Sequence, residues 1–500
     1  MPFDNVLLVL GNQLFDPRHF PAGVSPKNTL VFMREDMELC TYFRFHKQKL
    51  WFFLSAMRGH AAMLREKGYE VVYESLETDS KGTFEESLVR TVRASRARLI
   101  LFFEIEDHFF ESRIHQACAD EQIERREIPS PMFLTSRPEF AKYLASTKKP
   151  FMKTFYELQR RRLGILLDAK GGPVGGQWSF DAENRRPLPE NVHPPVHTRS
   201  KPSEMEIRVK DLIGERFADH PGDLETLYLP SDRAGALRRL QFFIDHQLAS
   251  FGPYEDALAQ GSDTVFHSVL TPFLNTGLLT PEEVIREVLK TEIVKRVPIE
   301  SLEGFARQVI GWREFIRGVY RHFDDTQQAS NFWNHDRRLS QVWYKGGSSL
   351  PQLERVLGKV FRLGYCHHIE RLMVLGNLML LLRVHPREAY RWFMEMFVDS
   401  SDWVMGPNVY GMALMSDGGI FATKPYICGS NYWRKMSREA AGPWCDGVDG
   451  LYWRFIETNA SFFRSNPRLS MMVQMAKKIP ADRRARLYQA ADGLLNELTE

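Results

Sequence analysis

The sequence has few cysteines and no apolar run long enough to cross a membrane. Its five cysteines form no Cys-x-x-Cys pair and no regular framework, so we expect free thiols in a reducing compartment. The apolar stretch from Leu372 to Val384 is too short for a membrane span and contains Arg383. No charged segment precedes the apolar residues near the N-terminus, as a secretion signal would require. These absences predict a cytoplasmic protein with no membrane segment.

The sequence also lacks a strong charge of either sign. Its 66 basic and 63 acidic residues give a net charge of +3, so a nucleic-acid partner is allowed, but any basic surface must be local. With 500 residues, 43% of them hydrophobic, the chain is long enough for two or three domains with large cores.

Residues 1–135 are predicted to form an α/β domain. Short strand-like runs alternate with helical ones, a pattern that indicates a doubly wound, Rossmann-like parallel sheet. The predicted strands are 6–10, 29–33, 70–73 and 98–103, and the predicted helices are 47–67 and 84–95. Loops at the carboxyl ends of such strands form ligand crevices, here at 11–13 and 34–38. There is no Gly-x-Gly-x-x-Gly, so an ordinary dinucleotide site is not indicated.

The remaining chain divides into two parts. Residues 136–230 are rich in glycine and proline and are predicted to form a long irregular connector that packs against the domains. Residues 231–500 show a helical periodicity nearly throughout and few strand signals, which predicts an all-helical C-terminal domain.

Two neighbouring histidines, His367 and His368, lie in an apolar helical pattern that runs from Gly364 to Leu382. Residues 368, 371 and 372 share one helix face because of their spacing. A pair of satisfied core histidines is one interpretation. The other is a functional pair, since imidazole is a suitable acid near neutral pH.

Three further segments of the helical half combine polar and helix-breaking residues. In segment 267–275, Thr271 precedes Pro272, so it either caps a helix or helps to hold an anionic phosphate at the helix start. Segment 311–315 (GWREF) lies either on a solvated basic face, with its tryptophan in the core, or beside a ligand. Segment 399–408 is a polar loop on a helical scaffold, which more often serves a ligand than the fold.

These elements, in this order, resemble the cryptochrome/photolyase family over essentially the whole chain. HSVLTPFL at 267–274 is similar to the family's flavin-phosphate segment, WREF at 312–315 matches a family motif, and GYCHHIERL at 364–372 is similar to its histidine-bearing helix. The resemblance implies an antenna domain, a connector and a helical domain that binds FAD.

The resemblance also assigns roles to individual residues. It implies His368 as the general acid and His367 as its orienting neighbour, and it makes Trp343 and Trp392 an electron relay. The residues that it implies around FAD are Ser268, Leu270, Thr271, Trp312, Arg313, Arg371, Asp399, Asp402 and Asn408. Glu314, Lys424 and Tyr426 are implied at the substrate, and Asn12, Gln13 and Glu38 at the antenna.

Longer strings are typical of one bacterial branch, the iron–sulfur bacterial cryptochromes and photolyases. They are HKQK (46–49), SPMFLTS (130–136), GGQWSFDAENRRPLP (175–189), HHIERLMVLGN (367–377), DWVMGPN (402–408) and TKPY (423–426). The branch binds FAD and a 6,7-dimethyl-8-ribityllumazine antenna, and its characterised activity is repair of (6-4) photoproducts.

The chain departs from this branch at several positions. A [4Fe–4S] cluster requires four thiolates, but segment 350–352 has no cysteine and segment 435–453 has only Cys445. We therefore expect no cluster and no other metal. Met405 replaces the usual glutamate, Phe393 replaces a relay tyrosine, and Asn12 replaces an aspartate at the antenna.

The resemblance implies light-dependent repair of (6-4) pyrimidine photoproducts, with photoexcited reduced FAD as the electron donor and damaged DNA as the partner. A blue-light photoreceptor with the same flavin is the alternative, and a light-independent DNA-binding remnant is a third. The histidine pair favours repair, whereas Met405, Phe393 and the missing cysteines favour the photoreceptor. We expect a monomer, and the sequence identifies no signalling partner. Basic residues expected to hold DNA phosphates are Arg307, Arg317, Lys424, Arg434 and Lys435.

Overall fold

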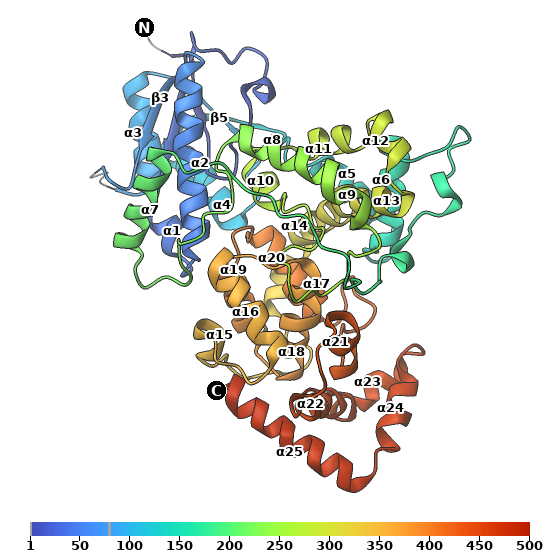
Figure 1. The fold of residues 1–500 in the computed structure, drawn as a ribbon. Helices are drawn as coiled ribbons and strands as arrows, with labels where there is room; N and C mark the ends of the chain where they lie inside the picture. Colours follow the sequence, from blue (N-terminus) through green and yellow to red (C-terminus); the bar gives the residue numbers. More distant parts are fainter. Residues whose placement is uncertain (1–2, 79–81) are drawn as a thin grey trace.

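The computed structural model describes residues 3–78 and 82–500, and its N-terminal part contains a parallel five-stranded sheet (Figure 1). The strand order is β3-β2-β1-β4-β5. The strands are β1 (Asn5–Leu8), β2 (Thr29–Arg34), β3 (Glu70–Glu74), β4 (Leu99–Phe103) and β5 (Glu124–Ile128). The helices between them are α1 (Met37–Thr41), α2 (Lys47–Glu66), α3 (Phe84–Ser95) and α4 (His108–Asp120).

Alternation along the central strands places apolar side chains on both faces of the sheet. Val6, Phe32 and Ile100 pack in one cluster with α3 and α4, whereas Leu7 and Leu101 pack in the cluster that includes α2 and the helical half. This two-sided burial is the physical reason for the predicted α/β architecture, which the structure confirms.

The sequence pattern missed the fifth strand. Residues 124–128 read Glu-Arg-Arg-Glu-Ile and lack an apolar period, because β5 lies at the edge of the sheet and its side chains are largely exposed. Its neighbour β4 supplies the hydrogen-bond ladder in parallel register. Pairing, and not side-chain burial, makes this segment a strand.

The connector is less irregular than predicted. Within 136–230 the chain forms α5 (Arg137–Ala145), α6 (Met152–Leu163) and α7 (Glu204–Arg216). Ser136 and Ser203 each begin a helix with a reciprocal capping box, a signal that the glycine and proline count obscured. The stretch between α6 and α7 and the stretch after α7 lack α-helix.

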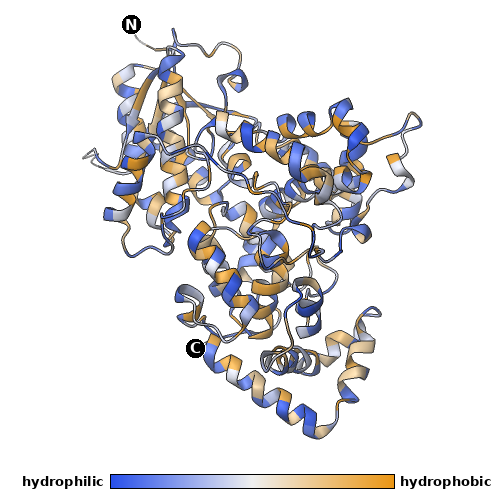
Figure 2. Cartoon of the chain, in the orientation of Figure 1, coloured by the Kyte–Doolittle hydropathy of each residue, from blue (hydrophilic) through white to orange (hydrophobic). Residues whose placement is uncertain are grey.

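Helices also make up most of the chain after residue 230. Its first α-helices are α8 (Arg233–Phe242), α9 (Leu248–Phe251), α10 (Thr271–Thr276), α11 (Pro281–Val288), α12 (Thr291–Arg296), α13 (Ile299–Ala306), α14 (Glu314–Ala329), α15 (Val342–Lys345) and α16 (Pro351–Leu363). These are followed by α17 (His368–Glu370), α18 (Asn377–Leu381), α19 (Pro386–Met396), α20 (Asp402–Gly406), α21 (Ser430–Ser437), α22 (Trp444–Thr458), α23 (Ala460–Ser465), α24 (Ser470–Lys477) and α25 (Ala481–Leu498). Figure 2 shows hydrophobic and hydrophilic residues mixed along these helices.

Four π-helical segments interrupt these helices. They cover Phe243–Gln247, Arg307–Arg313, Arg371–Gly376 and Pro407–Ala413. The helical pattern predicted from residue 364 to 382 is not one continuous helix. Gly364, with φ of 59°, ends α16, and α17 begins at His368. The π-helical segment follows from Arg371. π-Helical turns are frequent at functional sites.

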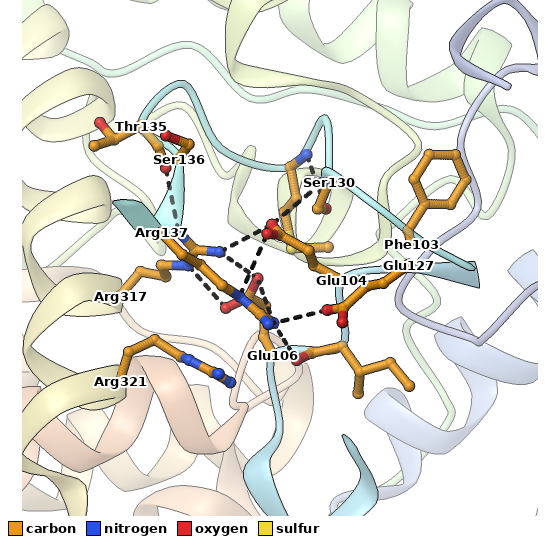
Figure 3. A network of polar contacts seen from close by, with 12 residues as sticks. Phe103, Glu104, Glu106, Glu127, Ser130, Thr135, Ser136, Arg137, Arg317 and Arg321 are labelled. Carbon is orange, nitrogen blue, oxygen red and sulfur yellow. Dashed lines mark hydrogen bonds and ion pairs between the residues drawn. The ribbon is translucent and has the colours of Figure 1, made fainter. Parts of the chain in front are cut away.

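An ion-pair network joins the sheet to α14 (Figure 3). Arg317 of α14 donates to both oxygens of Glu106, at 2.8 Å each, and to Glu104 at 3.3 Å. Arg137 of α5 donates to Glu111 at 2.6 Å and to Glu127 at 3.0 Å. The expectation that Arg317 holds DNA phosphates is therefore wrong, because its guanidinium is buried among carboxylates.

Arg307 is also misassigned as a phosphate ligand. It is buried and pairs with Glu303 at 3.2 Å, Asp181 at 3.4 Å and Glu255 at 3.5 Å. The spacing of basic residues along a helix does not show whether acidic residues from elsewhere in the chain pair with them. Among the described residues, no helix is both long and apolar enough to cross a membrane.

Candidate functional site

A cavity of about 230 Å³ lies in the helical half, and three of the four π-helical segments contribute to its wall. The widened turns begin at residues 307, 371 and 407. Most of the predicted flavin contacts line this cavity: Ser268, Leu270, Thr271, Trp312, Arg313, Arg371, Asp399 and Asn408. Residues from four distant parts of the sequence thus share one wall, as the resemblance implies.

Asp399 organises the polar part of the wall. Its carboxylate accepts from Thr271 Oγ1 at 2.6 Å and from Arg371 at 2.9 and 3.2 Å. Thr271 is the first residue of α10 and does not cap it, because the cap position is Leu270. Burial opposes the charge on Arg371, but the Asp399 carboxylate outweighs it and raises the pKa of Arg371. This arrangement keeps a guanidinium and a hydroxyl at the cavity.

Arg313 is a second buried cation of the wall. It donates to Asn275 Oδ1 at 2.5 Å and to Leu274 O at 3.1 Å, and its Nε has no partner. No carboxylate forms an ion pair with it in 3–78 or 82–500, and burial lowers its pKa to about 10. A buried guanidinium without a counter-charge fits an anionic ligand such as the diphosphate of FAD.

Segment 267–271 is held in an unusual backbone shape. Val269 has φ of 54°, a left-handed conformation that β-branched residues rarely adopt. Arg239 donates to the carbonyl oxygens of Ser268, at 2.8 Å, and of His267, at 3.2 Å. Arg239 was not identified from the sequence, because its role depends on a carbonyl 29 residues away.

Trp312 and Asn408 are joined across the cavity wall. Trp312 Nε1 donates to Asn408 Oδ1 at 3.1 Å, and Asn408 Nδ2 donates to Val404 O at 2.8 Å. The amide of Asn408 is therefore fixed with a defined orientation at the cavity.

The two predicted catalytic histidines face different surroundings. His368 lines the cavity and is exposed to it, and the surrounding protein together with Arg371 lowers its pKa. His367 does not line the cavity and is 1% exposed. Its Nε2 lies 3.4 Å from a carboxylate oxygen of Glu370, so its side chain is buried beside that carboxylate.

His367 instead supports a third histidine. Its ring stacks on that of His267, with centroids 4.6 Å apart and planes 9° apart. His267 lines the cavity, and its Nε2 lies 3.0 Å from Glu255 O. Burial, then His367, lowers the pKa of His267 well below its usual value. The sequence did not single out His267, because only the fold brings it beside 367.

Glu255 and Gln308 complete the polar end of the cavity near His267. Both line it, and Gln308 Nε2 donates to Glu255 Oε1 at 2.6 Å. Burial raises the pKa of Glu255, although Arg307 opposes the shift. These two residues were missed because they belong to no recognised motif.

The predicted relay tryptophans lie behind the wall. Phe393 lines the cavity, and its ring centroid is 5.4 Å from that of Trp392. Trp392 in turn lies 5.7 Å from Trp343, and both indoles are fully buried. Phe393 therefore stands between the cavity and the two tryptophans.

Four more of the predicted site residues also lie outside the cavity wall. Glu314 is buried and accepts from the backbone N–H groups of residues 134 and 135, at 3.0 and 2.8 Å. Asp402 accepts from Tyr390 at 2.6 Å. Lys424 is exposed and Tyr426 half-buried. The carboxylate of Glu314 is thus occupied in joining α14 to segment 130–136.

A second cavity of about 160 Å³ lies at the carboxyl ends of the strands, where the sequence predicted a crevice. Asn12 lines it and donates to Asp107 at 3.3 Å. Gln13 and Glu38 do not line it: Gln13 donates to the backbone of residues 103 and 104, and the exposed Glu38 pairs with Arg113. The loop positions were predicted well, but the side-chain directions were not.

The second cavity contains buried titratable groups that the sequence did not reveal. Lys49 lines it and donates to Ser400 O and Oγ, both at 2.9 Å, and burial lowers the pKa of Lys49 to about 7. Burial and the nearby Asp402 raise the pKa of Asp107 to about 8. Since Ser400 follows Asp399, the two cavities share one stretch of wall.

Cysteines do not gather in the described chain. Cys40, Cys118, Cys366 and Cys428 are buried singly, and Cys445 is half-buried. Over 3–78 and 82–500, no group of three His, Cys, Asp or Glu side chains could hold a metal ion.

Comparison with known proteins gave matches along the whole chain. Residues 7–228 match the family model described as deoxyribodipyrimidine photo-lyase-related protein. The chain is 32% identical over 504 residues to a protein named (6-4) photolyase from Agrobacterium fabrum, with 99% of each chain covered.

Two solved structures share the fold. A bacterial class III photolyase from Agrobacterium tumefaciens has a TM-score of 0.59 and 16% identity, covering 99% of this chain and 98% of its own. An archaeal photolyase from Sulfolobus tokodaii, solved with two FAD molecules, has a TM-score of 0.59 and 15% identity, covering 98% of this chain and all of its own.

Proposed function

This chain belongs to the cryptochrome/photolyase family, and we propose that it repairs (6-4) pyrimidine photoproducts in DNA under blue light. One observation carries the proposal: His368 lines the same cavity as Arg313, Arg371 and Asn408. A proton donor therefore lies beside the side chains suited to the flavin. The full-length relative named (6-4) photolyase supports the same substrate.

The family implies FAD as the cofactor, and the residues present fit it. Arg313 and Arg371 would face its phosphates, with Ser268 and Thr271 as hydroxyl partners, and Asn408 would face the flavin ring. When bound in reduced form and excited by blue light, the flavin supplies an electron to the lesion. Arg313 gains the counter-charge that it lacks within the described protein.

The protein's own contribution is to position the lesion and deliver a proton. The damaged bases must leave the duplex, and their unstacking costs less than that of undamaged bases. For a (6-4) lesion, an oxygen or nitrogen must return to the other base, so a positioned acid is needed. We assign this role to His368, with the polar end formed by Glu255, His267 and Gln308 beside it.

A blue-light photoreceptor with the same flavin is the second candidate. Met405 and Phe393 both line the cavity, and they replace a glutamate and a tyrosine expected from the bacterial branch. Neither thioether nor phenyl can carry a proton. A receptor would tolerate these losses, whereas it would not need His368.

Illumination of the purified, reduced protein with a (6-4)-containing oligonucleotide tests the proposal. We expect restored thymines in the light and none in the dark. Absence of repair on both (6-4) and cyclobutane substrates, with flavin bound, would leave the photoreceptor as the better assignment.

Two further assignments belong to this proposal. We expect a chain without a [4Fe–4S] cluster, because the family's cysteine positions are empty apart from Cys445; iron and acid-labile sulfide in anaerobically purified protein should both be near zero. About four irons per chain would contradict this expectation.

The second cavity, with Asn12, Lys49 and Asp107, is our candidate for a ribityllumazine antenna.

A further inference from the structure

We propose that a basic surface at the C-terminal end of the chain holds the backbone of duplex DNA outside the cavity. This inference rests on the proposed function and extends the DNA contact beyond the lesion. The C-terminal basic surface consists of Arg464, Arg468, Lys477, Lys478 and Arg483. It covers α23, α24 and the start of α25.

The charge of this region differs from that of the remaining chain. Residues 460–486 contain seven basic residues and one acidic residue, Asp482, and so carry a charge of +6. The whole chain carries only +3, so the remaining residues carry a net charge of −3. A local positive field of this kind attracts a polyanion.

The cations of the surface are also unpaired. All five are exposed, and none forms an ion pair or a side-chain hydrogen bond within the part of the chain that the structure describes. Nearby arginines behave differently: Arg454 pairs with Asp492 at 2.6 Å and Arg486 with Asp446 at 3.0 Å. Acidic partners are therefore within reach of this region, yet these five cations are left free for an outside partner.

Two exposed methionines lie among these cations. Met471 and Met475 of α24 are 71% and 51% exposed, and they share a helix face because they are four residues apart. Flexible apolar side chains beside cations suit a nucleic acid, since methionine packs against sugars or wedges between base steps while the cations hold phosphates.

The surface is continuous with the rim of the flavin cavity. Asn466, between α23 and α24, donates to Thr423 O at 3.0 Å. Phe421, two residues earlier, has its ring centroid 5.9 Å from that of Trp312, which lines the cavity. Figure 1 shows α23 and α24 near α21. A duplex with its lesion in the cavity can therefore reach the basic surface with its flank.

An anionic membrane would also attract cations and methionines. DNA is the better partner because residues 421–423 connect the surface to the cavity where the proposed substrate is bound. The five cations also lie on three helices and the turns between them, whereas a membrane-surface helix carries its cations on one face.

The test uses a fluorescent, undamaged 30-base-pair duplex and the flavin-loaded full-length protein. The triple variant Arg468→Glu/Lys477→Glu/Lys478→Glu should bind roughly tenfold more weakly, and the slope of log K against log salt should fall by about 2 to 3. Met471→Ser/Met475→Ser should weaken binding without changing the slope, because methionine releases no counterions.

The matched control reverses three exposed charges on α7 and its approach, at Lys201, Arg208 and Arg216. Equal loss of DNA binding in this control and in the triple variant would overturn the proposal, since net charge alone would then explain both. Unchanged DNA binding by the triple variant, with loss of its binding to phosphatidylserine vesicles, would assign the surface to a membrane. If the wild type binds DNA through this surface but repairs no lesion, only the proposed function fails.

Discussion

At the scale of single residues, adjacent side chains of this protein face opposite environments. His368 is exposed to the larger cavity, while His367 is buried against Glu370 and stacks on His267. The change of direction arises because residue 367 caps a helix that begins at residue 368. A direct contact with a substrate is therefore open to His368 and closed to His367.

His368→Ala should reduce photorepair at least about a hundredfold, the usual cost of losing a general acid. Flavin content should stay near the wild-type level, because Arg313 and Arg371 remain. Burial, and then Arg371, lowers the pKa of His368 to about 4, so wild-type repair should also decline as pH rises above about 4 and the imidazole loses its proton. The measurement is repair yield on a (6-4) oligonucleotide across pH, with the exposed His193 replaced by alanine as the control. Full repair by the His368 variant would remove this residue from the mechanism.

Asp107→Asn should make folding stability less dependent on pH. Burial and Asp402 raise the pKa of Asp107 to about 8, above the usual value of a free aspartate. Between about pH 4 and 8 the unfolded chain loses this proton while the folded protein keeps it, so wild-type stability declines as pH rises.

At pH 7 the variant should gain about 1 to 3 kcal/mol relative to wild type, with no gain at pH 4. Lys49, whose pKa is lowered to about 7, has the opposite effect only above pH 7, so it does not contribute to the difference between pH 4 and pH 7. Urea unfolding at both pH values measures the difference, and Asp336→Asn, at an exposed carboxylate, is the control. Parallel pH curves for variant and wild type would show that Asp107 is ionised in the folded state.

At the scale of elements, the cavity is built from helices that are locally widened. The π-helical turns at Arg307–Arg313, Arg371–Gly376 and Pro407–Ala413 each contribute to the wall. A widened turn shifts the register of the following residues, so apolar periodicity and functional side chains coexist on one helix. The tryptophans behind Phe393 belong to α15 and α19.

Trp392→Phe should sharply slow light-driven reduction of the bound flavin by an external reductant. Trp392 is the tryptophan in ring contact with cavity-lining Phe393, and Trp343 lies behind it. Phe393→Tyr should speed the same reaction, because a phenol is oxidised more easily than a phenyl ring. Flavin absorbance under steady blue light follows both, with Trp433→Phe as a buried control. Equal rates in the Trp392 variant and the control would exclude this relay.

At the scale of the whole molecule, carboxylates after β4 hold the helical half in place (Figure 3). Glu104 and Glu106 meet Arg317 of α14, and Glu111 of α4 meets Arg321 at 2.8 Å. The same interface forms the second cavity, which adjoins the first at residues 399–401. Relative placement of the two parts therefore decides the shape of the second cavity, which residues of both parts line.

Arg317→Met should lower the free energy of unfolding by about 3 to 5 kcal/mol, because Glu106 would remain buried without its partner. Arg391→Met, which removes a more exposed pair with Glu388, should cost less than about 1 kcal/mol. Denaturant unfolding of both variants measures the contrast. Equal, small losses would show that the network does not hold the two parts together.

The sequence by itself determined the α/β order of the first 135 residues and the helical character after residue 230. Alternating apolar strands and helical periods depend on local burial, which a linear pattern records. Most of the residues that the resemblance implied around FAD line the cavity, because Ser268, Arg313, Arg371 and Asn408 lie in recognisable motifs. Motifs of this kind specify chemistry at a position, and the fold brought them together as expected.

Only the tertiary structure decided where side chains point and which partners they meet. The sequence predicted Arg307 and Arg317 as phosphate ligands, but in the structure both pair with carboxylates from distant segments. The hydrophobic pattern did not predict edge strand β5, because its side chains are largely exposed and only its backbone pairs with β4. The ring of His267 stacks on that of His367, which lies one hundred residues later in the sequence. Long-range contacts of this kind leave no local period in a sequence, since their partners are set by packing and not by spacing.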